Sequence, residues 1–141
     1  MSLLLVSHDL AVIVGVCDKV AVMYAGEIVE QGRTAQVLRE PAHPYTLGLI
    51  NSLPEMSTSR RLPSIAGNPP EPGKLGEGCA FAPRCPMVID ACRNSTIPLR
   101  PIGNDRLARC IRAEEVPGVA LAMRSADLSL SLSRDRGVPV G

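Results

Sequence analysis

Aromatic residues are nearly absent from this sequence. Its 141 residues include two Tyr, one Phe and no Trp, although 45% of the chain is hydrophobic. The apolar residues are therefore mostly aliphatic, and they gather toward the two ends of the chain. Eleven of the 13 prolines lie between Pro41 and Pro101, which excludes one long helical bundle because proline breaks the interior of a helix. The length suits one ordinary domain.

A strong net charge and an export signal are also missing. The 15 Lys and Arg residues against 14 Asp and Glu leave a net charge of +1, so we expect no nucleic-acid partner. The first apolar run, residues 3–16, follows no basic residue and is interrupted by Ser7-His8-Asp9. It therefore fails as a signal peptide, and it is shorter than the roughly 20 residues that cross a bilayer.

Residues 1–53 alternate short apolar runs with polar turns, which is typical of an α/β fold. The continuous apolar run of residues 3–6 predicts a strand buried on both faces of a parallel sheet. Residues 20–24 and 27–30 predict a hairpin around Ala25-Gly26, with glycine at a positive φ. Helices are expected after Asp9 as N-cap, after Thr34 as N-cap, and from Pro44 onward.

The rest of the chain divides into two further predicted regions. Residues 54–117 are rich in proline and poor in apolar periodicity, so we expect loops that need something besides a hydrophobic core to hold them. Residues 118–141 contain a Leu-Ser alternation with no evident partner strand. They are expected to form a low-complexity, disordered tail.

Four cysteines fall inside the proline-rich region. Cys79, Cys85, Cys92 and Cys110 follow the spacing C-x5-C-x6-C-x17-C. With no export signal, disulfides are the weaker interpretation, and reduced cysteines that fill small gaps are another alternative. Four thiolates on stiff loops suit a 4Fe–4S cluster or, as the alternative, zinc. The wide spacing favours the larger cluster, and Arg84 is expected to offset thiolate charge.

Such a centre need not perform chemistry. A bound metal can contribute on the order of 10 kcal/mol to the folding of a segment that lacks its own core. The composition of residues 54–117 favours this structural role over electron transfer.

Two histidines stand near predicted element boundaries. The Ser7-His8-Asp9 string is not a hydrolase triad, because consecutive side chains project in different directions and a triad is defined by spatial roles. His8 follows the predicted buried strand, at the carboxyl edge of a sheet where ligands of open α/β folds bind. His43 precedes Pro44 and is expected to cap or pack locally.

Three blocks of sequence resemble the nucleotide-binding domain of ABC transporters and the extension found in its peptide-importing subfamily. The first consists of Leu4–Leu10, which includes Ser7-His8-Asp9, followed by Cys17–Gly32. The second is Glu40-Pro41-Ala42-His43-Pro44-Tyr45-Thr46, which resembles oligopeptide/dipeptide and nickel importer ATPases. The third is Gly78-Cys79-Ala80-Phe81-Ala82-Pro83-Arg84-Cys85-Pro86 with Cys92 and Cys110. The resemblance covers about residues 2–115, in the family's order.

The resemblance implies a fold, a site and partners. The fold would be the C-terminal end of a P-loop NTPase-type nucleotide-binding domain followed by a loop-rich, cysteine-containing extension. His8 would be the switch histidine, which hydrogen-bonds the γ-phosphate of ATP in an intact protein that also binds Mg²⁺. The partners would be permease subunits and a second ATP-binding subunit, with peptide delivered by a substrate-binding protein. The protein would be peripheral, on the cytoplasmic face of the membrane.

Several nucleotide-binding motifs of the family are missing from this sequence. It has no G-x-x-x-x-G-K-S/T phosphate loop, and the glutamine loop, the signature motif and the acidic strand end that carries magnesium are absent too. We therefore expect a C-terminal portion of a larger subunit. The alternatives are a free-standing four-cysteine metal or redox module, and a degenerate product without activity.

We predict that the purified 141-residue chain does not hydrolyse ATP, because both the phosphate cradle and the catalytic carboxylate are missing. A phosphate-release assay with and without Mg²⁺ checks this. Robust turnover that depends on Mg²⁺ would contradict the prediction.

Overall fold

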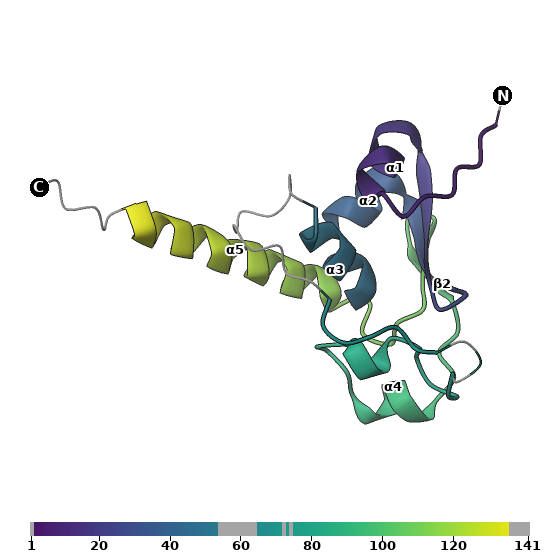
Figure 1. Ribbon diagram of the computed structural model, residues 1–141. Helices are drawn as coiled ribbons and strands as arrows, with labels where there is room; N and C mark the ends of the chain where they lie inside the picture. Colours follow the sequence, from purple (N-terminus) through teal and green to yellow (C-terminus); the bar gives the residue numbers. More distant parts are fainter. Residues whose placement is uncertain (1, 54–64, 72, 74, 136–141) are drawn as a thin grey trace, which may run out of the picture.

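A four-stranded antiparallel sheet lies at the centre of the computed structural model, which describes residues 2–53, 65–71, 73 and 75–135. Its strands are β1 (Lys19–Tyr24), β2 (Glu27–Arg33), β3 (Arg100–Gly103) and β4 (Arg106–Ala108). The order across the sheet is β1-β2-β4-β3, so strands from the first and second predicted regions share one sheet (Figure 1). The chain is thus a small α/β fold, and its described strands all pair antiparallel.

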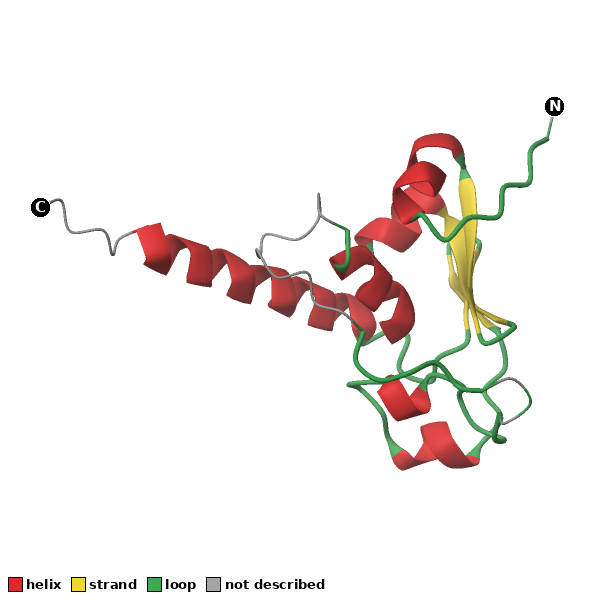
Figure 2. Ribbon diagram, in the orientation of Figure 1, coloured by secondary structure: helices red, strands yellow, loops and turns green. Residues whose placement is uncertain are grey.

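Helices cover one side of the sheet and extend beyond it. They are α1 (Leu10–Val16), α2 (Thr34–Arg39), α3 (Pro44–Asn51), the 3-10 helix η1 (Ala82–Arg84), α4 (Asp90–Asn94) and α5 (Val116–Asp135). Figure 2 shows α1, α2 and α3 on the same side of the strands, while η1 and α4 sit among loops past one end of the sheet. α5 projects away from the rest of the molecule.

The predicted hairpin is confirmed. β1 and β2 are joined by Ala25 and Gly26, which have φ angles of 49° and 82°. Two residues at positive φ form the tight turn whose twist matches that of the flanking strands. The pairing shifts between Val22 and Met23, where a bulge interrupts the ladder.

The predicted helix starts are correct to within one residue. The Asp9 carboxylate accepts a hydrogen bond from the Ala11 amide at 2.9 Å, so Asp9 is the N-cap of α1. Thr34 is the first residue of α2 and not its cap, because its hydroxyl donates to the Cys17 carbonyl instead. The N-cap of α3 is His43, whose ring nitrogen Nδ1 accepts from the Tyr45 amide at 3.1 Å. The predicted capping role of His43 is confirmed.

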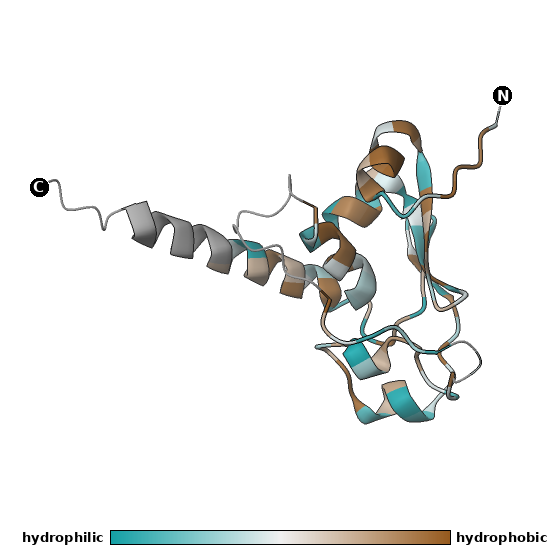
Figure 3. Cartoon of the chain, viewed as in Figure 1, coloured by the Kyte–Doolittle hydropathy of each residue, from teal (hydrophilic) through white to brown (hydrophobic). Residues whose placement is uncertain are grey.

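The predicted buried strand at residues 3–6 is wrong for this chain. This segment is extended, but none of the described strands pairs with it. Leu4 is 91% exposed and Val6 is 90% exposed, and Figure 3 shows the segment as a hydrophobic stretch standing apart from the sheet. An apolar run forms a buried strand only when neighbouring strands supply hydrogen bonds and cover both faces.

The expected disordered tail is also different in the structure. Residues 116–135 form α5, whose first turns pack Val116 and Ala120 against Leu47 and Met87. Leucine and alanine favour a helix wherever no partner strand is available for the Leu-Ser alternation. Residues 54–64 of the predicted loop region and 136–141 of the predicted tail lie outside the described residues.

The three aromatic residues meet in one cluster. The Tyr24 ring lies 4.7 Å from that of Tyr45 and 5.2 Å from that of Phe81, and Tyr45 and Phe81 are 5.4 Å apart, measured between ring centroids. Tyr24 comes from β1, Tyr45 from α3 and Phe81 from the cysteine-bearing segment. The few aromatic side chains therefore join the hairpin to the cysteine segment.

A buried carboxylate joins the same parts of the chain by hydrogen bonds. Glu30 on β2 is fully buried, and its two oxygens accept from the amides of Ala42 and His43, each at 3.0 Å. The Arg106 guanidinium on β4 also donates to Glu30 at 3.0 Å. The pKa of Glu30 is raised overall, because burial outweighs the hydrogen bonds, such as those from the Ala42 amide and Arg106, that lower it.

We predict that Glu30→Gln destabilises the chain by about 3 kcal/mol, because it leaves the buried Arg106 charge with only the exposed Glu40 carboxylate, 3.9 Å away, as counter-ion. Urea unfolding followed by circular dichroism measures the loss. The matched control is Glu27→Gln on the same strand, where a 44% exposed carboxylate lies 3.8 Å from Arg109. The control should cost less than about 1 kcal/mol. Equal losses in the two variants would contradict the assigned role of Glu30.

Candidate functional site

The four cysteines of the predicted metal centre line one cavity. Cys79, Cys85, Cys92 and Cys110 share it with His43, Arg112 and several apolar side chains. The space in it that the centre of a water-sized sphere can occupy is about 20 Å³. The structure therefore brings together four cysteines that span 31 positions of the sequence, from Cys79 to Cys110.

Backbone hydrogen bonds place the first three cysteines. The Cys79 amide donates to the Cys92 carbonyl at 2.7 Å, which sets the two residues side by side. The Cys79 carbonyl accepts from Ala82 at 2.9 Å, and the Ala82 carbonyl accepts from Cys85 at 3.3 Å, so the chain coils through η1 between these two cysteines. Loop geometry therefore holds these thiols near one another without a disulfide among them.

Gly78 makes the close approach of Cys79 and Cys92 possible. A Cβ atom at this position would lie 2.4 Å from the Cys92 carbonyl oxygen and 2.5 Å from the Arg93 carbonyl oxygen. These distances are far inside van der Waals contact, and the obstructing atoms belong to the backbone of α4. Only glycine fits here.

The sheet places the fourth cysteine. Cys110 follows β4, and the Arg109 amide next to it donates to the Val29 carbonyl on β2 at 2.8 Å. The Arg109 guanidinium donates to the Ile28 and Ile97 carbonyls, each at 3.0 Å. Arg109 therefore ties the Cys110 backbone both to β2 and to the loop after α4.

Burial keeps three of these thiols protonated in the absence of a cation. It raises the pKa of Cys110 to about 11 and raises the pKa of Cys79 and Cys85 above their usual value. The negative charge that each neighbouring thiolate would carry raises these pKa values further. Full ionisation of the group therefore needs a positive partner.

The cysteines share the cavity without converging on a single point. In the part of the chain that the structure describes, no group of three or more His, Cys, Asp or Glu side chains is placed to hold a metal ion. Cys17, the fifth cysteine, does not line this cavity.

Arg84 does not have the predicted role beside the thiols. Its guanidinium donates to the Ile65 and Ala66 carbonyls at 3.0 and 2.9 Å and to the Tyr24 hydroxyl at 3.2 Å. The arginine that lines the cavity is Arg112, which donates to the Met87 carbonyl at 2.8 Å and pairs with Glu115. The sequence offered no pattern that would distinguish Arg112 from the other arginines.

His43 also lines the cavity, although the sequence predicted for it only a local capping or packing role. It is 1% exposed, and burial lowers its pKa to about 4. The ring is therefore neutral at pH 7, and its centroid lies 5.9 Å from that of Phe81. Its place in the cavity depends on the packing of α3 against the cysteine segment, which sequence spacing does not reveal.

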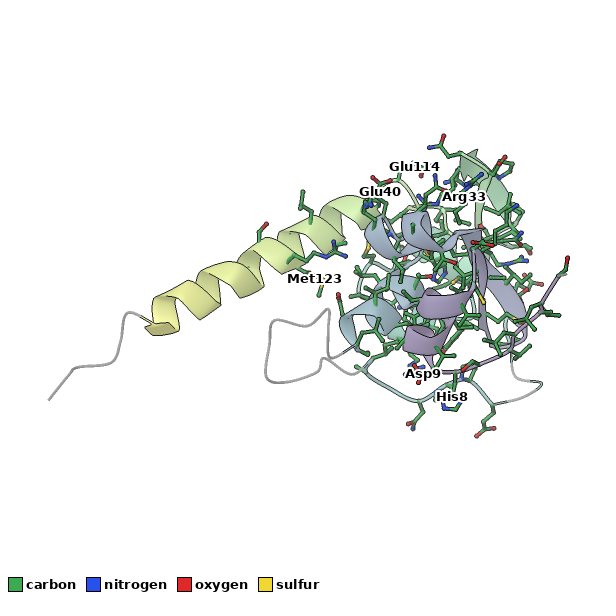
Figure 4. All side chains as sticks on the ribbon, turned by 90° about the horizontal axis from the view of Figure 1, so that it is seen from above. His8, Asp9, Arg33, Glu40, Glu114 and Met123 are labelled. Carbon is green, nitrogen blue, oxygen red and sulfur yellow. The ribbon has the colours of Figure 1, made fainter. Side chains whose placement is uncertain are left out.

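His8 lies apart from the cysteines. It is an exposed residue at a bend just before α1, and Figure 4 shows it with Asp9 at the edge of the molecule. α1 and α4 lie at opposite ends of the hairpin (Figure 1). The two sets of predicted site residues are thus separate in space, and the role predicted for His8 stays a prediction.

No helix among the described residues combines the length and the apolar character needed to cross a membrane.

We predict that Gly78→Ala destabilises the chain by about 1–3 kcal/mol, because backbone atoms must move to admit the new methyl group. Gly76→Ala is the matched control, since a Cβ at that position meets no atom within 4 Å. Thermal unfolding of both variants checks this. Equal stability of the two variants would show that Cys79 and Cys92 do not lie as described.

Comparison with known families and proteins finds similarity to one family of transporter proteins. Residues 29–92 match the family described as oligopeptide/dipeptide transporter, C-terminal region. The chain is 41% identical to the oligopeptide transport ATP-binding protein OppD of Salmonella typhimurium over 115 residues, which are 81% of this chain and 34% of that protein. The Escherichia coli protein of the same name is 40% identical over 115 residues, which are again 81% of this chain and 34% of that protein.

A third relative is longer. The oligopeptide transport ATP-binding protein OppD of Mycobacterium tuberculosis is 41% identical over 121 residues, which are 84% of this chain and 20% of that protein. The chain thus spans about a third or less of the length of these relatives. Residues 29–92 thus belong to the C-terminal region of the oligopeptide/dipeptide transporter family, and the chain is similar to part of ATP-binding proteins that carry this name.

Proposed function

We propose that this chain is the C-terminal part of an ATP-binding subunit that couples ATP binding and hydrolysis to peptide import. The observation that carries the proposal is the 40–41% identity to oligopeptide transport ATP-binding proteins over four fifths of the chain. In an intact subunit the chain would act with ATP and Mg²⁺, bound mostly by other parts of the protein. Specificity for the peptide would lie elsewhere in the transporter.

His8 is the residue of this chain that would touch the nucleotide. It is exposed and follows an extended apolar segment, as expected for a histidine at the end of a strand whose neighbours belong to the larger subunit. A side chain there can donate a hydrogen bond to the γ-phosphate as negative charge develops on it. The exposed Leu3, Leu4 and Val6 side chains would be covered in that assembly.

The partners follow from the same proposal. Permease subunits and a second ATP-binding subunit would hold the protein at the cytoplasmic face of the membrane as a peripheral component. Peptide would reach the permease from a substrate-binding protein.

The four cysteines fit a metal–sulfur centre in their number, chemistry and common cavity. They line one space, yet no three of the described ligand-type side chains converge as a single ion requires. The wide spacing of the four cysteines in the sequence favours a 4Fe–4S cluster over zinc, because such a cluster is larger than a single ion. Cys79, Cys85, Cys92 and Cys110 would hold the cluster as thiolates, and the positive iron would supply the charge that the buried thiols need.

The centre would act as a structural link. The cysteines come from the loop before η1, the loop after it, α4 and the chain just past β4. A shared ligand would fix these four segments relative to one another, in a part of the chain with short helices and few large apolar side chains. Pairing of β4 with β2 counts against a free-standing module made of residues 54–117 alone.

We predict that the chain purified without oxygen contains iron and acid-labile sulfide in equal amounts, and that Cys92→Ser loses most of both. Cys17→Ser is the matched control, because Cys17 lies outside the cavity, and it should keep the wild-type content. Metal analysis and visible absorbance measure the outcome. Stoichiometric zinc without sulfide would contradict the cluster, and a wild-type chain without either metal would contradict the centre altogether.

A further inference from the structure

His43 is oriented by two hydrogen bonds on its own residue. Its backbone amide donates to the buried Glu30 carboxylate at 3.0 Å, and its Nδ1 accepts from the Tyr45 amide at 3.1 Å. The first bond fixes the backbone at the start of α3, and the second fixes the rotation of the imidazole. The ring therefore has one defined orientation, packed beside Phe81.

The Tyr45 bond also determines which nitrogen carries the proton. A neutral imidazole has one N–H donor and one acceptor nitrogen, and Nδ1 is the acceptor here because an amide N–H points at it. The proton is accordingly assigned to Nε2. Among the described residues no hydrogen bond to Nε2 is found, so this N–H is left available as a donor.

The cavity is where that donor can be used. His43 lines it together with the four cysteines, and most of the remaining lining is apolar, including Phe81 and Ile97. The guanidinium of Arg112, the other polar group, is already bound to Met87 and Glu115. Sulfur carrying negative charge is the acceptor that this cavity would offer to the free Nε2–H of His43.

We propose that His43 donates its Nε2–H to a sulfur atom of the centre held by Cys79, Cys85, Cys92 and Cys110. This inference rests on the metal–sulfur centre proposed above. Hydrogen bonds to sulfur withdraw electron density and make reduction of an iron–sulfur centre easier. The buried Glu30 would then influence the centre indirectly, because it fixes the residue that presents the donor.

Two substitutions separate the donor from the cap. His43→Asn keeps a side-chain oxygen that can cap α3, but it is too short to carry a donor to the position of Nε2. His43→Gln carries an amide N–H₂ to about that position and caps poorly. His43→Asn therefore removes the donor and keeps the cap, whereas His43→Gln removes the cap and keeps the donor.

The test uses the full 141-residue chain, reconstituted without oxygen with Fe²⁺ and sulfide, in wild-type, His43→Asn and His43→Gln forms. Iron content, unfolding by circular dichroism, and the reduction potential from a titration monitored by electron paramagnetic resonance are measured for each. We expect a more negative potential for His43→Asn with near-wild-type stability. For His43→Gln we expect lower stability with a potential closer to wild type.

The possible failures are distinguishable. Iron bound in all three forms with the same potential would overturn the role of His43 and leave the centre intact. The role of His43 would also be overturned if the reduction potential shifted more in His43→Gln than in His43→Asn, in parallel with the loss of stability. A wild-type chain that takes up no iron would overturn the proposed centre and this inference together.

Discussion

The carboxylate of Glu30 is the interaction on which the arrangement of this chain depends. It is fully buried on β2, and it receives the amides of Ala42 and His43 on one side and the Arg106 guanidinium of β4 on the other. One side chain thus fixes the start of α3 and the neighbouring strand. A buried charge is stable only with such a complete set of partners, so the chain between residues 42 and 106 must return to the sheet at this point.

The return of the chain to the sheet at β4 also forms the cysteine cavity. Cys110 is placed by β4 and Arg109, while Cys79, Cys85 and Cys92 are placed by short backbone hydrogen bonds and by the glycine at position 78. Phe81, which belongs to this segment, packs against the hairpin beside both tyrosines. A chain with only three aromatic residues therefore uses all of them where its two regions meet, and a bound cluster would strengthen the same junction.

Features that depend on neighbouring residues were predictable from the sequence, and features that depend on distant contacts were not. The turn at Ala25-Gly26 and the caps Asp9 and His43 follow from local backbone chemistry. The family and the four cysteines were found from motifs, although Arg84 was given a role for which the structure places Arg112. The sheet pairing of β4 with β2 and the burial of Glu30 needed tertiary contacts. The exposed residues 3–6 show the same limit, since a strand forms only where partners exist.

Native-state hydrogen exchange tests most directly whether Glu30 and Arg106 join the two regions into one cooperative unit. The informative amides are those of Ala42 and His43, which donate to Glu30, and that of Arg109, which donates to β2 from the end of β4. The account predicts that all three exchange through one opening with a common free energy. A much smaller opening free energy for Arg109 than for Ala42 and His43 would show that the cysteine region unfolds separately, and it would contradict the account.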